Sequence, residues 1–359
     1  MKCTQLCRRM AACVLAAAIL VAVPAGCASG ENSAEQLNVA LQTTAQGVPA
    51  YIAETEGANE RAGLTVSSTV FASGPAQNEA LGANEWDVAT MGAPPAIMAN
   101  IAYDARILAI VLMEASTEFF VRADSDIAQV SGAVPGYPMI LGDADSWRGK
   151  TVLCPVATTS HFILLTLLDM LGLTEEDINI INMDVGQAYT AFKAGQGDVV
   201  ALWDPVSFSA EGEGWVRAAY GPDIPAYTPC VLVASQKAID EKPELIKKWL
   251  KTYFDEVELG NKDSAYFAGH TYDLLNENNV TITEDESVVF IERKKFFTLE
   301  ESLSFFQGEP GNTLADQYIN AIMDFFVEQG HISESERDAV LADSIFYPRF
   351  LEELAGGAG

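Results

Sequence analysis

The stretch from Ser146 to Pro205 constrains the fold of this chain more than any other. It reads SWRGKTVLCPVATTSHFILLTLLDMLGLTEEDINIINMDVGQAYTAFKAGQGDVVALWDP, in which short apolar runs alternate with polar turns and amphipathic segments. This order predicts strand, helix, strand, helix and strand, which is a βαβαβ half of a parallel sheet. The predicted strand Thr151–Pro155 precedes the predicted helix Phe162–Leu171, and Gly172 ends that helix as a C-terminal cap.

The turn between this strand and this helix, Ala157–His161, is rich in hydroxyl groups. The first N–H groups of a helix have no partner within the helix and lie at the positive end of its dipole. Thr159 and Ser160 are therefore suited to hold a carboxylate, sulfonate or other oxyanion, at the carboxyl end of a strand where open α/β sheets bind ligands. The alternative is that a Ser or Thr at this junction only caps the helix.

A second half of the same kind precedes this stretch. It has predicted strands at 37–41, 64–71, up to 90, and 106–113, which alternate with predicted helices at 48–62, 77–81 and 96–101. Two such halves imply two similarly built α/β lobes. Glu114–Ser125 is interpreted as an extended crossing, and Ala226–Ser235 as a strand that returns to the first lobe. From Lys237 onward the pattern predicts helices, at 243–259, 264–276, 284–297, 313–329 and 334–341.

Composition excludes several classes of protein. With 359 residues, 49% of them hydrophobic and 20% charged, the chain is long enough for two globular lobes. A net charge of −29 repels nucleic acid and anionic lipid, so neither is predicted as a partner. The three histidines, His161, His270 and His331, have no metal-ligand spacing, so no metal or other cofactor is predicted. Cys154 and Cys230 lie in apolar runs, which predicts two buried free thiols.

The first 27 residues are typical of an export signal. Basic residues at 2, 8 and 9 precede the apolar run Met10–Val23 of about 14 residues, which is too short to span a membrane. Ala25, Gly26 and Cys27 then form a small-residue cleavage site. We interpret residues 1–27 as a lipoprotein signal that ends at a lipidated Cys27, and residues 28–35 as a tether. The alternative is an ordinary secretory signal that is cut nearby, and either reading predicts a location outside the cytoplasm.

Five phrases along the chain occur in the same order in a known family. They are the polar turn Gln42–Gly47, GLTV at Gly63–Val66, DVATMGAPP at Asp87–Pro95, RGKTV followed by TTSHF within Arg148–Phe162, and AGQGDVVALWDP at Ala194–Pro205. The chain thereby resembles the substrate-binding proteins of ABC importers in the nitrate, sulfonate and taurine group, which are related to the thiamine-precursor binders. The resemblance implies an α/β, two-lobed type II periplasmic-binding-protein fold with a ligand cleft between the lobes and a helical C-terminal region. It places lobe 1 at 36–118, lobe 2 at 119–225, and the return strand with the C-terminal helices at 226–359.

The resemblance also implies a set of ligand-facing residues, which come from the turns after the strands. They are Gln42, Thr44, Ala45, Met91, Gly92, Thr159, Ser160, His161, Trp203 and Asp204. Several of these have a structural alternative. Trp203 would belong to the core, Asp204 would shape a turn before Pro205, and His161 would be exposed on the first turn of its helix. As a ligand residue, Asp204 would instead pair with an ammonium group or accept a hydrogen bond from a hydroxyl group.

These features predict a lipid-anchored receptor that captures a small-molecule solute and delivers it to an ABC permease with its ATPase. The expected solute is a small organic anion or a zwitterion, sulfonate-like, taurine-like or amino-acid-like. Its acidic end would lie on Thr159 and Ser160, and its amine would face Asp204. We expect a monomer whose only contact with the membrane is the lipid anchor.

Three alternatives remain open at this point. A cationic or aromatic solute would use a cage of aromatic rings drawn from Trp86, Tyr189, Trp203 and Trp215. Arg122 and Arg148 are the only basic residues near the candidate turns. Because so little positive charge is available there to bind an anion, this alternative stays open. A sensor or adhesion protein would use the same cleft without transport. An enzyme is not predicted, because the chain has no G-x-S-x-G elbow, metal cluster or dinucleotide fingerprint.

Overall fold

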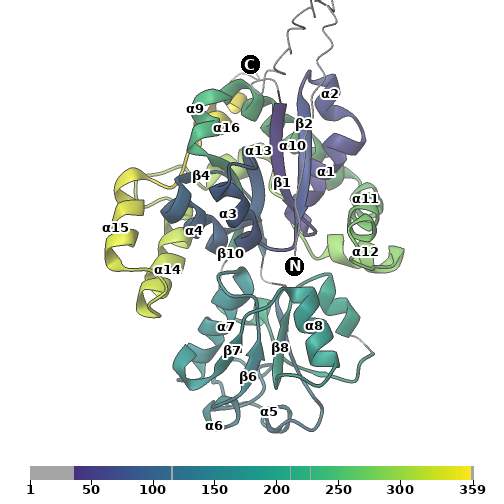
Figure 1. The fold of residues 1–359 in the computed structure, drawn as a ribbon, viewed down its shortest axis with the longest axis vertical. Coiled ribbons are helices and arrows are strands. Elements are labelled where there is room, and N and C mark those ends of the chain that lie inside the picture. Colours follow the sequence, from purple (N-terminus) through teal and green to yellow (C-terminus); the bar gives the residue numbers. More distant parts are fainter. Residues whose placement is uncertain (1–35, 115, 211, 227, 357–359) are drawn as a thin grey trace, which may run out of the picture. The chain divides into compact units, whose positions relative to one another are not determined.

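Two five-stranded sheets, each with helices packed against it, make up the fold (Figure 1). A computed structural model of the protein describes residues 36–114, 116–210, 212–226 and 228–356. The predicted signal at 1–27, with Cys27, and the predicted tether at 28–35 lie outside the described residues. All of the described residues fall within one compact unit. None of the described helices is both long enough and apolar enough to cross a membrane.

The first sheet, which we call the core of lobe 1, has the strand order β2-β1-β3-β10-β4. Its strands are β1 (Gln36–Gln42), β2 (Thr65–Phe71), β3 (Val88–Gly92), β4 (Ala105–Glu114) and β10 (Thr228–Ser235). β1 runs parallel to β2 and β3, whereas β10 is antiparallel to β3 and β4. The chain therefore leaves this sheet after β4 and returns to it through β10.

Apolar side chains on both faces of the first sheet explain why helices cover both faces. Leu37, Val39 and Leu41 of β1 pack in one cluster with α1, α10 and α11, whereas Ala40 faces the other cluster, with α3, α4 and α14. These helices are α1 (Val48–Thr55), α3 (Gly74–Gly82), α4 (Ala93–Tyr103), α10 (Pro243–Lys262), α11 (Ser264–Glu277) and α14 (Leu314–Glu328). Successive strand residues thus serve opposite sides of the sheet.

The second sheet, the core of lobe 2, has the order β7-β6-β8-β5-β9. Its strands are β5 (Glu118–Val121), β6 (Thr151–Leu153), β7 (Asn179–Ile181), β8 (Val199–Leu202) and β9 (Val216–Tyr220). α7 (Thr159–Met170) packs against one face, and α8 (Val185–Lys193) packs against the other. The predicted βαβαβ half corresponds to β6, α7, β7, α8 and β8. Strand β9 was not predicted from the sequence.

The remaining elements are short helices and the C-terminal region. They are α2 (Ala58–Arg61), α5 (Asp126–Gln129), α6 (Ala144–Trp147), α9 (Gln236–Glu241), α12 (Glu284–Glu292), α13 (Leu299–Ser304), α15 (Glu334–Asp343) and α16 (Arg349–Gly356), with the 3-10 helices η1 (Ala45–Gly47), η2 (Glu175–Asp177), η3 (Val206–Ala210) and η4 (Gly221–Asp223). The helix predicted at 48–62 is divided into α1 and α2. Gly57 lies between them with φ of 70°, a left-handed conformation that ends a helix and that glycine adopts without strain.

The C-terminal helices contact both lobes. Helix α14 packs on α4 of lobe 1. Near its end, the rings of Phe325 and Phe326 meet the edge of Phe162 on α7 of lobe 2, at centroid distances of 5.4 and 6.1 Å. Edge-to-face pairs at this spacing are favourable beyond the area they bury. Helix α14 therefore joins the two lobes on the side away from α1 and α10.

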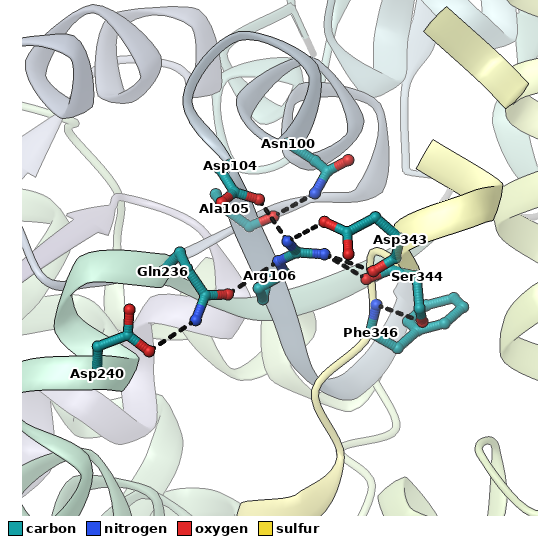
Figure 2. Close-up of polar contacts among 9 residues, drawn as sticks. All are labelled: Asn100, Asp104, Ala105, Arg106, Gln236, Asp240, Asp343, Ser344 and Phe346. Atoms are coloured by element: carbon teal, nitrogen blue, oxygen red, sulfur yellow. Dashed lines mark hydrogen bonds and ion pairs between the residues drawn. The ribbon is translucent and has the colours of Figure 1, made fainter. Parts of the chain in front are cut away.

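Arg106, at the start of β4, ties the last part of the chain to the first sheet (Figure 2). Its Nη1 donates to the carbonyl oxygens of Asp343 and Ser344, at 2.7 and 2.6 Å. Its Nη2 donates to Asp104 Oδ1 at 2.6 Å, and its Nε donates to Gln236 Oε1 at 3.1 Å. Because one planar guanidinium satisfies all of these acceptors, the end of α15 is fixed beside β4.

Candidate functional site

A small cavity lies between the two lobes, at the carboxyl ends of β1, β3 and β8. Its volume is about 50 Å³, which leaves room for a few water-sized groups. It is lined by Gln42, Thr44, Gln46, Ser73, Gly74, Gly92, Pro95, Ser116, Thr117, Thr158, Thr159, Ser160, Trp203, Asp204 and Cys230. The lining comes from both lobes and from the crossing that follows β4. Such a position between two sheets is where open α/β folds hold small ligands.

Four helical segments begin at this cavity. The residues that precede η1, α3, α4 and α7 are Thr44, Ser73, Gly92 and Thr158. The first three make no side-chain capping bond, whereas Thr158 Oγ1 accepts from the N–H of His161 at 3.4 Å. The first N–H groups of a helix lack partners within it, so backbone donors and the positive ends of several dipoles converge on the cavity. Proline in the first turns of α3 and α4 reduces the number of N–H groups that these two helices offer. Among the described residues that line it, none is Lys, Arg or His.

The amide of Gln42, at the end of β1, has a fixed orientation. Gln77 Nε2 donates to the carbonyl oxygens of Ala40 and Thr90, at 3.0 and 3.2 Å. Gln77 Oε1 must therefore accept, and it does so from Gln42 Nε2 at 2.5 Å. The buried Gln77 thus determines which group Gln42 presents to its surroundings.

Two polar groups of the lobe 1 wall are buried without a partner in the described structure. They are the hydroxyl oxygen of Thr44 and the amide oxygen Oε1 of Gln46. Gln46 is 3% exposed, and its backbone carbonyl accepts from Tyr253 OH at 2.9 Å, so the residue is held in place. A buried polar atom without a partner costs free energy unless a ligand or water supplies one. These two atoms therefore indicate a polar ligand.

The lobe 2 wall is formed by the start of α7. Ser160 Oγ lies 2.8 Å from Thr117 Oγ1, which connects this helix to the crossing. Thr159 lies against Gly92 of lobe 1 so closely that a Cβ atom on residue 92 would be 2.6 Å from Thr159 Oγ1. Gly92 therefore allows β3 of one lobe and α7 of the other to approach at the cavity.

Asp204 lines the cavity, but its charge is already paired. Its side chain is fully shielded from solvent, and Oδ1 accepts from Ser207 Oγ at 2.7 Å. Its Oδ2 lies 3.4 Å from Lys294 Nζ and 3.7 Å from Arg293 Nη1, both just after α12. The expectation that Asp204 pairs with an ammonium group of the solute is therefore revised, because protein donors engage both carboxylate oxygens.

The structure brings together most of the predicted site residues. Those that line the cavity are Gln42, Thr44, Gly92, Thr159, Ser160, Trp203 and Asp204. Ala45 and Met91 are 1% and 0% exposed and belong to the apolar clusters of lobe 1, because strand and turn residues next to a lining residue face the other side. His161 is directed away from the cavity, toward His331 and Glu175, because a helix turns by about 100° per residue after Ser160.

Several lining residues were not predicted. Ser73 could have been found by the rule that selected Thr44, because it too follows a strand and precedes a helix. Thr117 and Ser116 lie in the crossing, where no periodic pattern points to the cavity. The aromatic cage considered from the sequence does not form, because only Trp203 of its proposed members lines the cavity. Trp86 is buried with its Nε1 donating to Gln77 O, and Trp215 packs on Phe192.

The two basic residues considered for the site also have other roles. Arg122 donates to the carbonyl oxygens of Gly197 and Phe192, at 2.7 and 3.0 Å. Arg148 is half exposed and pairs with Asp177. Cys154 and Cys230 are buried and unbridged, as predicted, and burial raises the pKa of the Cys154 thiol far above its ordinary value.

Outside the cavity, the structure gathers three groups that the sequence spacing separated. His161, Glu175 and His331 lie together, with one potential ligand atom from each within 4.8 Å of the others. The two imidazoles hold the pKa of Glu175 below its ordinary range. The contribution of His161 is larger than that of His331. We call this group the His–Glu–His cluster.

A two-lobed α/β fold with a polar cavity between the lobes is the periplasmic-binding-protein fold. Solved structures with this fold are similar to the chain. The periplasmic aliphatic sulphonate binding protein of Escherichia coli superposes with a TM-score of 0.63 at 18% identity, over 84% of this chain and 94% of that one. The periplasmic nitrate-binding protein of Synechocystis superposes with a TM-score of 0.69 at 12% identity, over 90% and 89%.

Sequence comparison gives the family. The profile of the NMT1-like family matches residues 30–265, and the chain belongs to that family. A protein of Brachyspira hyodysenteriae, named as an ABC transporter periplasmic binding protein, is 30% identical over 87% of this chain and 88% of its own length. The taurine-binding periplasmic protein of Escherichia coli is 23% identical, over 63% and 66%. The expected family resemblance and the expected fold class are thus confirmed.

Proposed function

We propose that this protein is the solute-binding component of an ABC importer, and that it holds a small organic anion in the cavity between its lobes. The observation that carries the proposal is the convergence of uncapped helix starts and the partnerless Thr44 hydroxyl on a cavity without a cationic side chain. The partnerless Gln46 Oε1 is an acceptor, so it suits a donor of the solute, such as the amine of a zwitterion, or water. Helix starts bind oxyanions through backbone N–H groups and dipoles. The names of the relatives, which are binding proteins, support this reading and support a role without catalysis.

An acidic end group explains the cavity better than an amine does. Both oxygens of Asp204 already have protein partners, so this carboxylate offers little to an ammonium group. The hydroxyl groups of Thr159 and Ser160 stand at the start of α7, where a sulfonate or carboxylate receives hydrogen bonds. A zwitterion such as an aminosulfonate fits if its amine lies away from the helix starts.

Three small molecules that differ in one end group test this assignment. In a thermal-shift measurement on the purified protein, ethanesulfonate and taurine are expected to raise the melting temperature, and ethylamine is not. At about 100 times its dissociation constant, a bound solute stabilises the folded state by roughly 2.7 kcal/mol. Stabilisation by ethylamine alone would replace the anion with a cation, and the absence of any shift would contradict this class of solute.

Replacing Thr44 by valine separates a role in binding from a role in stability. Val is close to Thr in shape and lacks the hydroxyl that is buried without a partner. Thr44→Val is therefore expected to leave the stability of the solute-free protein unchanged or raise it by about 1 kcal/mol. The affinity for the solute, measured by isothermal titration calorimetry, is expected to fall about tenfold, since one hydrogen bond is worth roughly 0.5–1.5 kcal/mol.

A matched control lies in the same sheet. Thr90 on β3 also has a buried hydroxyl without a partner, but it does not line the cavity. Thr90→Val should change stability in the same direction and leave the affinity unchanged. Equal affinity in Thr44→Val and the unchanged protein would remove the Thr44 hydroxyl from the binding site.

The location and anchoring of the protein form part of the same proposal. The named relatives are periplasmic binding proteins, which supports a place outside the cytoplasm. We further infer that residues 1–27 are removed, that Cys27 carries the lipid, and that the monomer delivers its solute to a permease with its ATPase. The mass of the N-terminal peptide checks the lipid, because an unmodified peptide that begins elsewhere would contradict it.

A further inference from the structure

The His–Glu–His cluster joins parts of the chain that are far apart in sequence. His161 lies in the first turn of α7, Glu175 opens η2, and His331 follows α14. His331 Nε2 lies 2.6 Å from Glu175 Oε2, and His161 Nε2 lies 3.7 Å from the same oxygen. The two imidazole rings meet edge to face, with their centroids 4.8 Å apart. Three groups that are common metal ligands thus point at one small region.

One of these groups is buried, and its Nε2 makes no hydrogen bond among the described residues. His161 is 1% exposed, and its Nε2 has no hydrogen bond in the described structure. Its other nitrogen, Nδ1, receives only a long contact of 3.4 Å from the N–H of Ala157. The ring is therefore oriented with a free Nε2 toward Glu175 and His331. The neighbouring acceptor, Glu175 Oε2 at 3.7 Å, is beyond hydrogen-bond distance, so this buried nitrogen is left for a ligand or water to satisfy.

We propose that the His–Glu–His cluster is a binding site for a divalent transition metal ion of the zinc type. Two imidazole nitrogens and one carboxylate oxygen are a donor set that zinc prefers, and hard cations such as Mg²⁺ do not. Tetrahedral zinc holds its ligand atoms roughly 3.3 Å apart at bond lengths of about 2.0–2.2 Å. The present separations, from 2.6 Å to at most 4.8 Å, require shifts of about an ångström.

The surroundings leave a path for the ion and a place for a fourth ligand. The side chains of Glu175 and His331 are 31% and 24% exposed, so the cluster is open to solvent on their side. The side chain of His161 is buried and forms the inner wall of the cluster. A water molecule completes the coordination there, as in zinc sites that have three protein ligands. The carboxylate of Glu175 offsets part of the charge of the ion.

The ion would fasten the two lobes together. His161 and Glu175 belong to lobe 2, whereas His331 follows α14, which packs on α4 of lobe 1. His161 is also the neighbour of Ser160, which lines the cavity. Metal at this site therefore favours the arrangement in which the cavity is enclosed, and solute and metal would each raise the affinity for the other.

Titration of the full-length purified protein with ZnCl₂, after removal of metal by chelation and dialysis, tests the proposal. One ion per chain is expected to bind in isothermal titration calorimetry, and Co²⁺ is expected to give the intense visible bands of a four-coordinate site. Glu175→Gln and His331→Gln are each expected to weaken zinc binding more than 100-fold, since loss of a mere supporting contact costs about 10–100-fold. Both residues are partly exposed, so both variants should fold, and a thermal melt without metal checks this.

The chain supplies a matched control. His270 lies 3.6 Å from Glu56 and is likewise partly exposed, but the described residues place no third metal ligand beside it. His270→Gln should bind zinc as tightly as the unchanged protein. The proposal is overturned if no zinc binds, if the Co²⁺ spectrum is that of six-coordinate ion, or if all three variants bind zinc equally, which would assign it to the acidic surface. If no zinc binds, the proposed function still stands, because solute binding is measured separately with ethanesulfonate on the metal-free protein.

Discussion

Asp204→Ala is expected to lower the free energy of unfolding by about 3–5 kcal/mol, the usual cost of removing one partner from a buried ion pair. The side chains of Asp204 and Lys294 are 0% and 4% exposed, so the ammonium loses its carboxylate in a place that water hardly reaches. Ser207 loses its acceptor in the same change. Denaturation in urea, followed by fluorescence, measures the difference.

Two further variants show whether the ion pair is the cause. Asp204→Asn keeps an acceptor for Ser207 but removes the charge. Its free energy of unfolding should therefore lie between that of the unchanged protein and that of Asp204→Ala. The exposed pair of Asp255 with Lys251, at 2.6 Å, is the matched control, and Asp255→Ala should cost less than about 1 kcal/mol. Similar losses in Asp204→Ala and Asp255→Ala would show that burial of the pair is unimportant.

The same ion pair has a consequence for binding. Asp204 follows β8 in lobe 2, whereas Lys294 follows α12. A little further along the same segment, the N–H of Phe297 donates to Val111 O on β4 of lobe 1 at 2.8 Å. The pair therefore crosses between the lobes beside the cavity. Hinge closure around a ligand depends on such contacts between lobes. Weaker solute binding in Asp204→Ala would follow from this bridge, even without direct contact between Asp204 and the solute.

Gly92→Ala is expected to reduce the affinity for the solute roughly tenfold to a hundredfold. The added Cβ would lie 2.6 Å from Thr159 Oγ1, a distance at which one of the two lobes must move. Such overpacking costs about 1–3 kcal/mol, and every 1.4 kcal/mol is a factor of ten in affinity. Because the strain is relieved when the lobes separate, the loss should affect binding more than unfolding.

A second substitution should relieve the effect of the first. In Gly92→Ala combined with Thr159→Ala, the clashing oxygen is absent, so the double variant should bind like Thr159→Ala alone. Gly186→Ala is the control, because a Cβ atom there would meet no atom within 4 Å. Calorimetric titration with ethanesulfonate measures all four proteins. An unchanged affinity in Gly92→Ala would mean that the solute binds without the close approach of β3 and α7.

The alternation of strands and helices could be predicted from the sequence, because it depends on local patterns. Apolar runs such as Thr151–Leu153, and the amphipathic segments between them, specify β6, α7, β7, α8 and β8 one after another. Where the local pattern was weak, as in the partly buried edge strand β9, the prediction failed. The division of the first long helix depended on the backbone conformation of Gly57.

Part of the site was predictable for the same reason. Parallel strands end at one edge of a sheet, so polar residues after them, such as Gln42 and Thr159, meet without any knowledge of packing. The family resemblance added Trp203 and Asp204 to this set. Side-chain direction was less predictable, because His161 and Ser160 are neighbours in sequence and point to different parts of the molecule.

The sequence by itself determined the two α/β lobes, the turns that meet at the cavity and the family, because each is encoded by residues close together in the chain. Only the tertiary structure decided which side chains from distant parts of the chain contact the residues of those turns. Lys294 reaches Asp204 across 90 positions, and His331 reaches Glu175 across 156. Such pairs form where helices from a distant part of the chain pack against both lobes. Their spacing in the sequence carries no signal, because the contact depends on three-dimensional packing and not on local periodicity.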